Sequence, residues 1–335
     1  MISRSLIRKL IIVAIAAQLL VLLVMAGKRE FILAKGDIVY LRSAPIDPRD
    51  PFRGDFVRLQ YDFNRISISE YHGQKPFAKF RRGDIIYGVL KPQDDQVYFV
   101  NHFTDSPTNN ELAIKGRITT KAYSRQPNPT HLNAKFGIEQ YFVQQGKGKE
   151  MEATLGSRNS LQVPVEMKIA LGDDGTAVIG DHRWSNIGVQ LSFERATPRA
   201  SNSSEGDAII SPLILVSLEN VSDKALVFAT RGDDCDFSLS QVDQDQSKAN
   251  IDTGCTENAK NTAQLISLAP GENHTVEIDM SKPRWHFMDK KGNTIEMGEG
   301  NLWRRYRLRY TAPLADNAWQ GFMNTPAFRT TGNID

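Results

Sequence analysis

The sequence predicts a mainly β protein with an N-terminal transmembrane helix, a β-rich first domain and a C-terminal β-sandwich. Three observations predict this. One uncharged apolar run lies near the N-terminus, most of the remaining chain alternates apolar and polar residues, and turn sequences rich in Gly, Pro, Asn and Asp separate the alternating segments. A length of 335 residues has room for two domains.

The apolar run at residues 10–27 contains no charge and no proline, and Gln18 is its one polar side chain. As a helix it would span about 27 Å, close to the ~30 Å thickness of the hydrocarbon layer. A cleaved signal peptide, with its cleavage site at residues 24–26, is the alternative. Because signal peptides have shorter apolar runs of about 7–15 residues, we expect a single retained anchor.

Basic residues flank the run on both sides, so their bias gives little orientation: Arg4, Arg8 and Lys9 precede it, and Lys28, Arg29 and Lys35 follow. The sizes of the two ends indicate the orientation better. We expect residues 1–9 to be a cytoplasmic head and the large body to be exported. The predicted location is the bacterial inner membrane, with the body in the periplasm.

The chain has two cysteines, Cys235 and Cys255, both in the predicted exported body. An even number in an oxidising compartment favours a disulfide. It would close a loop of roughly 20 residues, which stabilises a fold by about 3 kcal/mol in the chain-entropy model. Two free thiols are the alternative, and the spacing of Cys and His around them does not fit a zinc site.

We expect the first domain to cover residues 36–185. Its predicted strands share short apolar runs or period-two alternation, and they are residues 56–61, 84–90, 96–101, 137–143, 163–171 and 176–179. A turn at 92–95 makes the second and third of these a hairpin. The one segment with a helical pattern is 149–155, which Gly156 would end.

We expect the second domain to cover residues 186–335. Its predicted strands are residues 189–193, 213–218, 225–229, 264–268, 274–278 and 303–310, a spacing typical of a β-sandwich. Residues 218–224, a strand that leads into a polar turn, resemble the start of extracytoplasmic immunoglobulin-like modules. That resemblance implies a fold and no function.

Residues 54–61 read GDFVRLQY and are similar to the family of membrane-anchored bacterial proteins named for the motif G-D-Y-x-x-L-x-Y. The departure is Phe56 at the first Tyr of the motif. Residues 41–53 resemble the P-x-D-P-R-D approach of that family, and 137–143 with 146–148 resemble its later G-I-E-x-Y-F-V segment. The resemblance covers about residues 1–180. It implies an anchored, exported domain and supplies no established activity.

The residues of the motif and of the proline-rich segment before it also predict a local structure without the family resemblance. Gly54 permits a positive φ at a tight turn, Asp55 can accept a backbone N–H there, and the prolines stiffen the approach. Ion pairs among the charged residues would then hold a structural loop, and a ligand- or partner-binding loop is the alternative. The candidate residues are Pro45, Asp47, Pro48, Arg49, Asp50, Arg53, Gly54, Asp55, Phe56, Leu59 and Tyr61.

The leader-peptidase fold gives a sharper enzymatic hypothesis, because those enzymes also follow an anchor with a Pro-containing segment and a Gly-Asp strand. The position of their nucleophilic Ser corresponds to Ile46 here, and Ser43 is out of register. Lys79 and Lys91 are candidate bases by proximity alone. A serine needs a base within hydrogen-bond reach, so no catalytic residue is predicted.

The sequence gives little indication of nucleic-acid binding, of a metal site or of a cofactor site. Outside residues 1–27, basic and acidic residues nearly balance, which argues against nucleic-acid binding. The six histidines are scattered singly, and Asp243 and Asp245 start an incomplete calcium loop. The sequence contains no dinucleotide fingerprint and no phosphate-binding Gly-Lys loop. We therefore predict no cofactor and no metal.

The strand at 303–310 places Tyr306, Leu308 and Tyr310 on one face and three arginines, Arg305, Arg307 and Arg309, on the other. The arginine face can pair with acids on a neighbouring strand, or it can dock an anionic lipid or an acidic partner.

Together, these features predict a non-enzymatic, membrane-anchored accessory or scaffolding protein that binds another envelope protein. The alternative is an active or degenerate serine hydrolase of the leader-peptidase kind, and a solute-binding module is a third class.

Overall fold

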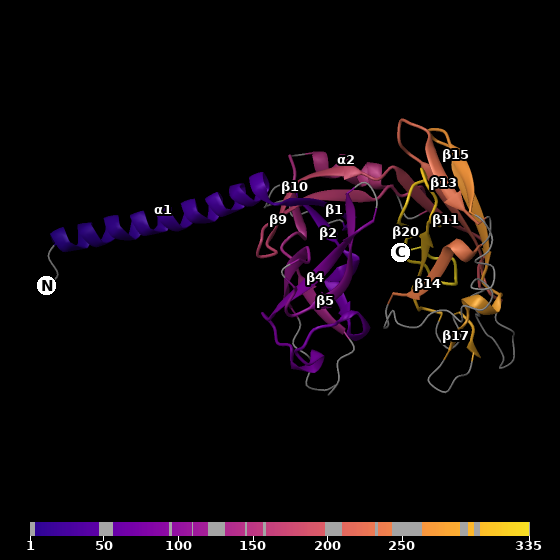
Figure 1. Ribbon diagram of the computed structural model, residues 1–335, viewed down its shortest axis with the longest axis horizontal. Helices are drawn as coiled ribbons and strands as arrows, with labels where there is room; N and C mark the ends of the chain where they lie inside the picture. Colours follow the sequence, from indigo (N-terminus) through magenta and orange to yellow (C-terminus); the bar gives the residue numbers. More distant parts are fainter. Residues whose placement is uncertain are drawn as a thin grey trace.

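The computed structural model is mainly β, with one long N-terminal helix (Figure 1). It describes residues 4–46, 56–93, 96–108, 110–119, 131–144, 146–156, 159–197, 210–231, 234–242, 263–288, 294–297 and 302–334. We call residues 37–184 the first domain and residues 187–334 the second domain, because each set forms a hydrophobic core of its own.

Helix α1 (Arg4–Lys35) continues well beyond the predicted apolar run. Its segment Arg8–Lys35 is long and apolar enough to cross a membrane, by length and composition, and its most apolar part is not buried against the described protein. The helix lies at one end of the molecule and the second domain at the other, with the first domain between them (Figure 1).

The first domain is built on a ten-stranded sheet, in which eight strands follow the order β10-β9-β1-β5-β4-β6-β7-β3. The other two strands lie off this path: β2 pairs with β1, and β8 pairs with β2. Its strands are β1 (Asp37–Ile46), β2 (Phe56–Gln60), β3 (Arg65–Ser67), β4 (Ile85–Pro92), β5 (Val97–Thr104), β6 (Ala113–Ile118), β7 (His131–Lys135), β8 (Gln140–Phe142), β9 (Val165–Leu171) and β10 (Ala177–Trp184). The predicted β4–β5 hairpin is confirmed, and its two strands are antiparallel.

Strand β1 was not predicted, although it lies inside the sheet. It pairs antiparallel with β9 over Asp37–Ser43, parallel with β5 at Tyr40 and Leu41, and antiparallel with β2 from Ala44 to Ile46. The proline-rich sequence that follows it suggested an irregular approach, but Pro45 falls at the end of the strand, where a missing N–H is tolerated.

Helix α2 (Lys147–Leu155) starts two residues before its predicted range and is followed by Gly156, whose φ is 86°. Short 3₁₀ turns complete the two domains: η1 (Asp62–Asn64), η2 (Ile68–Glu70), η3 (Phe77–Lys79), η4 (Asp234–Asp236) and η5 (Pro283–Trp285).

The second domain contains antiparallel sheets with the orders β11-β12-β16, β14-β19-β20, β13-β15 and β17-β18, packed on one core. Its strands are β11 (Ile187–Arg195), β12 (Leu213–Asn220), β13 (Leu226–Thr230), β14 (Phe237–Gln241), β15 (Gln264–Leu268), β16 (Asn273–Asp279), β17 (Phe287–Met288), β18 (Thr294–Ile295), β19 (Tyr306–Thr311) and β20 (Phe322–Asn324). As predicted, Tyr306, Leu308 and Tyr310 share the buried face of β19.

Candidate functional site: the interface between the two domains

The motif strand β2 carries its apolar residues into the core of the first domain. Val57, Leu59 and Tyr61 are buried, while Arg58 and Gln60 between them are exposed. Phe56 pairs with Phe142 of β8 in the backbone register. The described part of the motif is therefore a core strand.

Most of the candidate residues that precede the motif strand lie outside the part of the chain that the structure describes. Asp47, Pro48, Arg49, Asp50, Arg53, Gly54 and Asp55 lie outside the described residues, and only the backbone of Pro45 and Phe56 is described. The choice between a structural loop and a binding loop stays a prediction.

Tyr61 ends the motif in an apolar setting. Its ring stacks on Phe63 with 5.0 Å between centroids, and its buried hydroxyl has no hydrogen-bond partner among the described residues. Burial, and then the charge of Glu139, raise the pKa of this hydroxyl above its ordinary value. The tyrosine stays neutral and acts here as an aromatic core residue.

Asp62 follows the motif directly and contacts the second domain. Arg307 Nη1 donates to its Oδ1 at 2.6 Å, and Asn324 Nδ2 donates to its Oδ2 at 2.7 Å. Desolvation raises the pKa of Asp62 on its own, but the charges of Arg307 and Arg309 and the two hydrogen bonds outweigh it and hold the pKa below its ordinary value. Asp62 is therefore ionised at neutral pH and binds the second domain as a carboxylate.

In the predicted arginine face, Arg307 contacts the first domain, whereas Arg309 contacts residues of its own domain. Arg307 pairs with Asp62, and Arg309 Nε donates to Asn324 Oδ1 at 2.9 Å while its guanidinium lies 4.2 Å from the ring centroid of Phe322. Arg305 precedes β19, and its carbonyl accepts the N–H of Val242. In this structure Arg307 bonds across the contact between the domains, and the charge of Arg309 also acts on Asp62.

A second set of contacts converges on the backbone of Phe322. Its carbonyl accepts Arg42 Nη1 at 2.6 Å and Gln93 Nε2 at 3.1 Å. The ring of Phe322 packs edge-on against Phe99, with 5.4 Å between centroids, and the guanidinium of Arg42 lies 5.7 Å from the ring of Trp319. The tip of the β4–β5 hairpin and the middle of β1 thus hold the same strand of the second domain.

Arg42 is itself oriented by a carboxylate that is almost fully buried. Glu166 of β9, whose side chain is 4% exposed, accepts Arg42 Nε at 3.0 Å and Arg183 Nε at 2.8 Å. The three residues lie opposite one another in the register of β1, β9 and β10. This row fixes the direction in which Arg42 reaches the second domain.

The chain connection provides a third contact. Only Ser185 and Asn186 separate β10 from β11, and Gln162 exchanges two backbone hydrogen bonds with Val189 at 2.9 and 2.8 Å. Leu161 packs so closely on Gly188 that a Cβ there would lie 2.8 Å from Leu161 Cδ1. Because the contacts are spread over three separated places, the interface restrains rotation of one domain against the other.

The junction between α1 and the first domain is equally tight. Ile32 is buried with Ala170 and Val178, and Lys28 Nζ lies 3.0 Å from Asp174 Oδ2 in the turn between β9 and β10. Gly36, the one residue between α1 and β1, lies so close to β9 that a Cβ would be 2.5 Å from the carbonyl oxygen of Leu171. No flexible linker separates the helix from the sheet.

Ser43, the serine considered as a nucleophile, is buried in β1 at 5% exposure. Its Oγ donates to the carbonyl of Gln60 at 3.1 Å, across the β1–β2 pair. Ser43 therefore contributes to strand pairing, and this position does not favour the hydrolase alternative.

The structure brings together histidines that the sequence showed only as isolated residues. His72 and His102 stack with 4.9 Å between ring centroids, and Tyr141 Oη lies 3.4 Å from His182 Nδ1. Burial, and then the charge of His72, lower the pKa of His102. Among the described residues there is no group of three or more His, Cys, Asp or Glu that could hold a metal ion.

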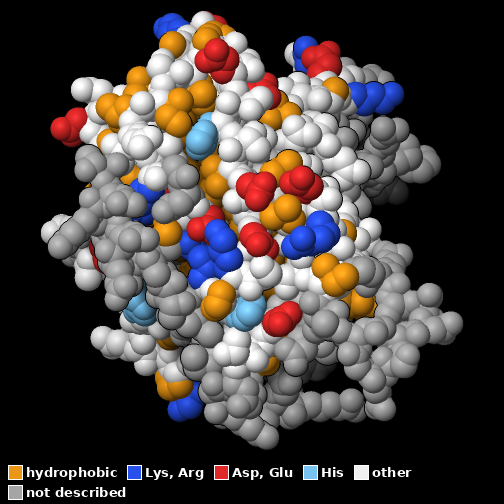
Figure 2. All heavy atoms as spheres, turned by 90° about the vertical axis from the view of Figure 1, so that its right-hand side faces the viewer, with side chains coloured by type: hydrophobic (Ala, Val, Ile, Leu, Met, Phe, Trp, Pro, Cys, Tyr) orange, Lys and Arg blue, Asp and Glu red, His pale blue; other side chains and the backbone are white. Residues whose placement is uncertain are grey.

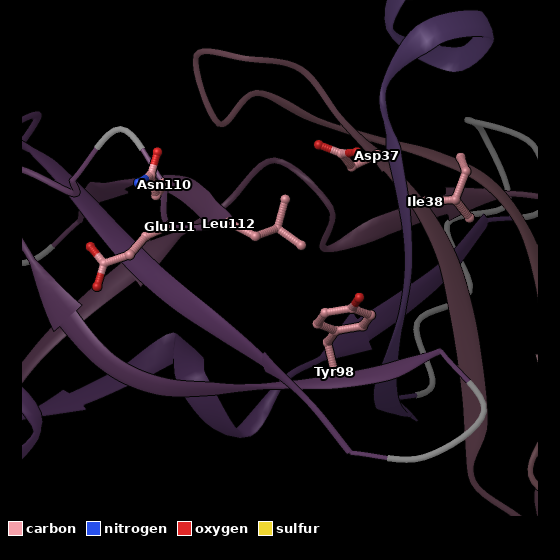
Figure 3. A pocket seen from close by; sticks show the side chains of 6 residues that line it. All are labelled: Asp37, Ile38, Tyr98, Asn110, Glu111 and Leu112. Atoms are coloured by element: carbon pink, nitrogen blue, oxygen red, sulfur yellow. The ribbon is translucent and has the colours of Figure 1, made fainter.

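A shallow pocket of about 400 Å³ opens beside the start of β1, lined by Asp37, Ile38, Tyr98, Asn110, Glu111 and Leu112 (Figure 3). The side chains of Tyr98 and Leu112 point toward its centre, whereas the carboxylate of Glu111 points away (Figure 3). Its polar groups do not converge on one point, so it offers no arrangement for catalysis.

Cys235 lies in η4, where its Sγ accepts a hydrogen bond from Arg284 Nη1 at 3.1 Å. Cys255 lies outside the described residues, so the predicted pairing of the two cysteines stays a prediction.

Comparison with known proteins gives one match. Residues 18–181 match the family model described as GDYXXLXY protein, which supports the resemblance found in the motif segments for α1 and the first domain. The match ends at Asp181, before the second domain. No curated protein and no solved structure matches the chain.

Proposed function

We propose that the protein is a non-enzymatic accessory or scaffolding protein, anchored by α1 in the bacterial inner membrane with its N-terminus in the cytoplasm and its body in the periplasm. On this proposal it binds another envelope protein and holds it near the membrane. The immunoglobulin-like assignment of the second domain belongs to the same proposal, and the antiparallel sheets β11-β12-β16 and β14-β19-β20 on one core support it.

The observation that carries the proposal is the continuous packing from the apolar helix through the first domain to the second domain. Gly36 alone joins α1 to β1, and the contacts of Arg42 and Asp62 lock the two domains together. Such a body keeps its far end at a fixed distance and orientation from the bilayer. A binding surface placed in this way gains effective concentration for a partner that is also in the membrane.

The surface at the far end of the molecule agrees with protein binding more than with nucleic-acid binding. In the view of Figure 2, acidic and basic side chains are interspersed on its described part, and hydrophobic side chains lie among them. A nucleic-acid interface would show one extended basic surface.

The proposal is tested by isolating the full chain from native membranes in mild detergent and quantifying co-purifying proteins by mass spectrometry, with an unrelated single-span envelope protein as control. We expect one envelope protein to be enriched in stoichiometric amount, with no change in the Ser43→Ala variant. The proposal fails if no protein is enriched over the control. It also fails if Ser43→Ala abolishes the effect of the protein on the cell while circular dichroism shows that the variant is folded.

The predicted disulfide belongs to the same proposal, because it requires an oxidising compartment. We expect a non-reduced tryptic digest to contain a linked peptide pair with Cys235 and Cys255. Quantitative alkylation of both thiols without reductant would contradict the periplasmic location as well as the disulfide.

A further inference from the structure

The membrane-spanning part of α1 carries one polar side chain at its middle. Gln18 lies about 12–14 Å along the helix from either end of the apolar run 10–27, so it would lie near the centre of the bilayer. Its side chain is exposed and makes no hydrogen bond to the described residues. A carboxamide has two donors and an acceptor, and lipid tails satisfy none of them.

Gln18 belongs to a stripe with a defined direction. Ala14, Gln18, Val21 and Met25 follow one another at spacings of four, three and four, which places them on one face of the helix, and we call them the Gln18 stripe. The same spacing continues to Lys28 and Ile32, the residues that contact Asp174, Ala170 and Val178. Drift of about 20° per heptad rotates the face by only about 40° between Gln18 and Ile32.

The direction of the Gln18 stripe restricts which helix can pack against it. The Gln18 stripe faces the side of α1 on which the first domain lies, so a helix packed against it would end beneath the domain. A second copy related by a parallel two-fold axis would direct its own first domain into the same space. The occupant must therefore be a helix whose end at this membrane surface carries no bulky domain.

The groups above the stripe indicate the character of that end. The turn between β9 and β10 presents the exposed carboxylates of Asp173 and Asp174, and Asp174 pairs with Lys28 and lies 3.9 Å from Lys115 Nζ. A helix that ends there with a basic residue complements the exposed carboxylate of Asp173. The small side chain of Ala14 beside Gln18 lets a neighbouring helix approach closely, as in other membrane helix pairs.

We propose that the Gln18 stripe binds a transmembrane helix of another integral membrane protein, which pairs a polar side chain with Gln18 near the bilayer centre and ends beneath the first domain. The inference rests on the proposed function and names the kind of partner and the surface that it contacts. Partner binding then involves the anchor as well as the exported body.

The test uses the full chain in native membranes with a photoreactive benzophenone residue at Val21, on the stripe, or at Leu23, on the opposite face at similar depth. We expect an adduct from position 21 and not from position 23, mapped by mass spectrometry to a membrane-spanning peptide of one other protein. Gln18→Leu should lower its yield roughly 3- to 16-fold, the range for one hydrogen bond between membrane helices, and Gln18→Asn should keep most of it.

Equal adducts from both faces, no protein adduct at all, an adduct only with a second copy, or a yield that Gln18→Leu leaves unchanged would each overturn the inference. Co-purification from the same membranes separates the two proposals. A partner that co-purifies while the stripe gives no specific adduct contradicts the helix contact alone. The absence of both contradicts the proposed function as well.

Discussion

Tyr61 shows how a motif residue can be fixed by packing alone. Its ring is buried against Phe63, and its hydroxyl is buried without a partner among the described residues. We predict that Tyr61→Phe leaves the free energy of unfolding unchanged or raises it by up to about 1 kcal/mol, because an unsatisfied buried hydroxyl is removed. Tyr61→Ala should lower it by about 3–5 kcal/mol, and denaturant unfolding of the full chain measures both. A clear loss in Tyr61→Phe would show that the hydroxyl has a partner, such as an ordered water.

Asp174 gives a second prediction at this scale, on pH. Hydrogen bonding with Thr176 has the largest effect on its pKa; desolvation opposes it, Lys28 adds to it, and the pKa falls to about 2. Because the pKa of Asp174 is lower in the folded state than its unfolded value of 3.8, the ionised carboxylate stabilises the folded state fully at pH values above 3.8. This stabilisation is lost as the pH falls toward 2. We expect the contact of α1 with the turn to persist at pH 4 and to weaken below pH 3. An NMR titration of the Asp174 carboxyl measures this, and a midpoint near 4 would contradict it.

The junction of α1 and β1 depends on a single small residue. A Cβ at Gly36 would lie 2.5 Å from the carbonyl oxygen of Leu171 and 2.6 Å from that of Ile32, whereas a Cβ at Gly27 would meet nothing within 4 Å. We predict that Gly36→Ala destabilises the first domain by about 1–3 kcal/mol, because backbone must move to admit the methyl group. Gly27→Ala is the matched control and should have little effect. Thermal unfolding in detergent tests the pair, and equal melting of both variants would show that the junction is loose.

The sequence predicted some elements well because their causes are local. The alternation in β19 placed Tyr306, Leu308 and Tyr310 on the buried face, and the alternation over residues 57–61 did the same for Val57, Leu59 and Tyr61. Strand β1 was missed because the prolines that follow it resemble those of a loop, while its pairing with β5 and β9 is set by distant segments. The α1 run was recognised from composition, but its continuation to Lys35 depends on packing of Ile32 against Ala170 and Val178.

The interface could not be derived from the sequence because its contacts join residues that lie far apart in the chain. Asp62 and Arg307 are 245 positions apart, and no period in either strand records which residue faces the other. The alternation in β19 predicts the arginine face, but the contact of Arg307 with Asp62 depends on how the two domains pack together. The buried row Arg42–Glu166–Arg183 likewise depends on the register of three strands.

At the scale of the whole molecule, the interface is expected to make one rigid body of the two domains. The Asp62–Arg307 pair is partly exposed, so its loss alone should cost about 0.2–1 kcal/mol, and a like-charge contact adds to that loss. We predict that Arg307→Asp broadens the distance distribution between spin labels on noncanonical residues at Lys79 and Ser267, which lie in different domains, in pulsed EPR of the full chain. Adding Asp62→Arg restores opposite charges and should narrow the distribution again.

The exposed Arg58 of β2 supplies the matched control, because Arg58→Asp makes the same change of charge at a side chain with no hydrogen bond or ion pair to the described residues of the second domain. It should leave the distribution as narrow as in the unaltered protein. If Arg307→Asp and Arg58→Asp gave the same distribution, the ion pair would not restrain the domains, and the contacts of Phe322 with Arg42 and Gln93 would carry the restraint. A broad distribution in the unaltered protein would instead remove the basis for a fixed distance between bilayer and second domain, and the scaffold proposal would lose the observation that carries it.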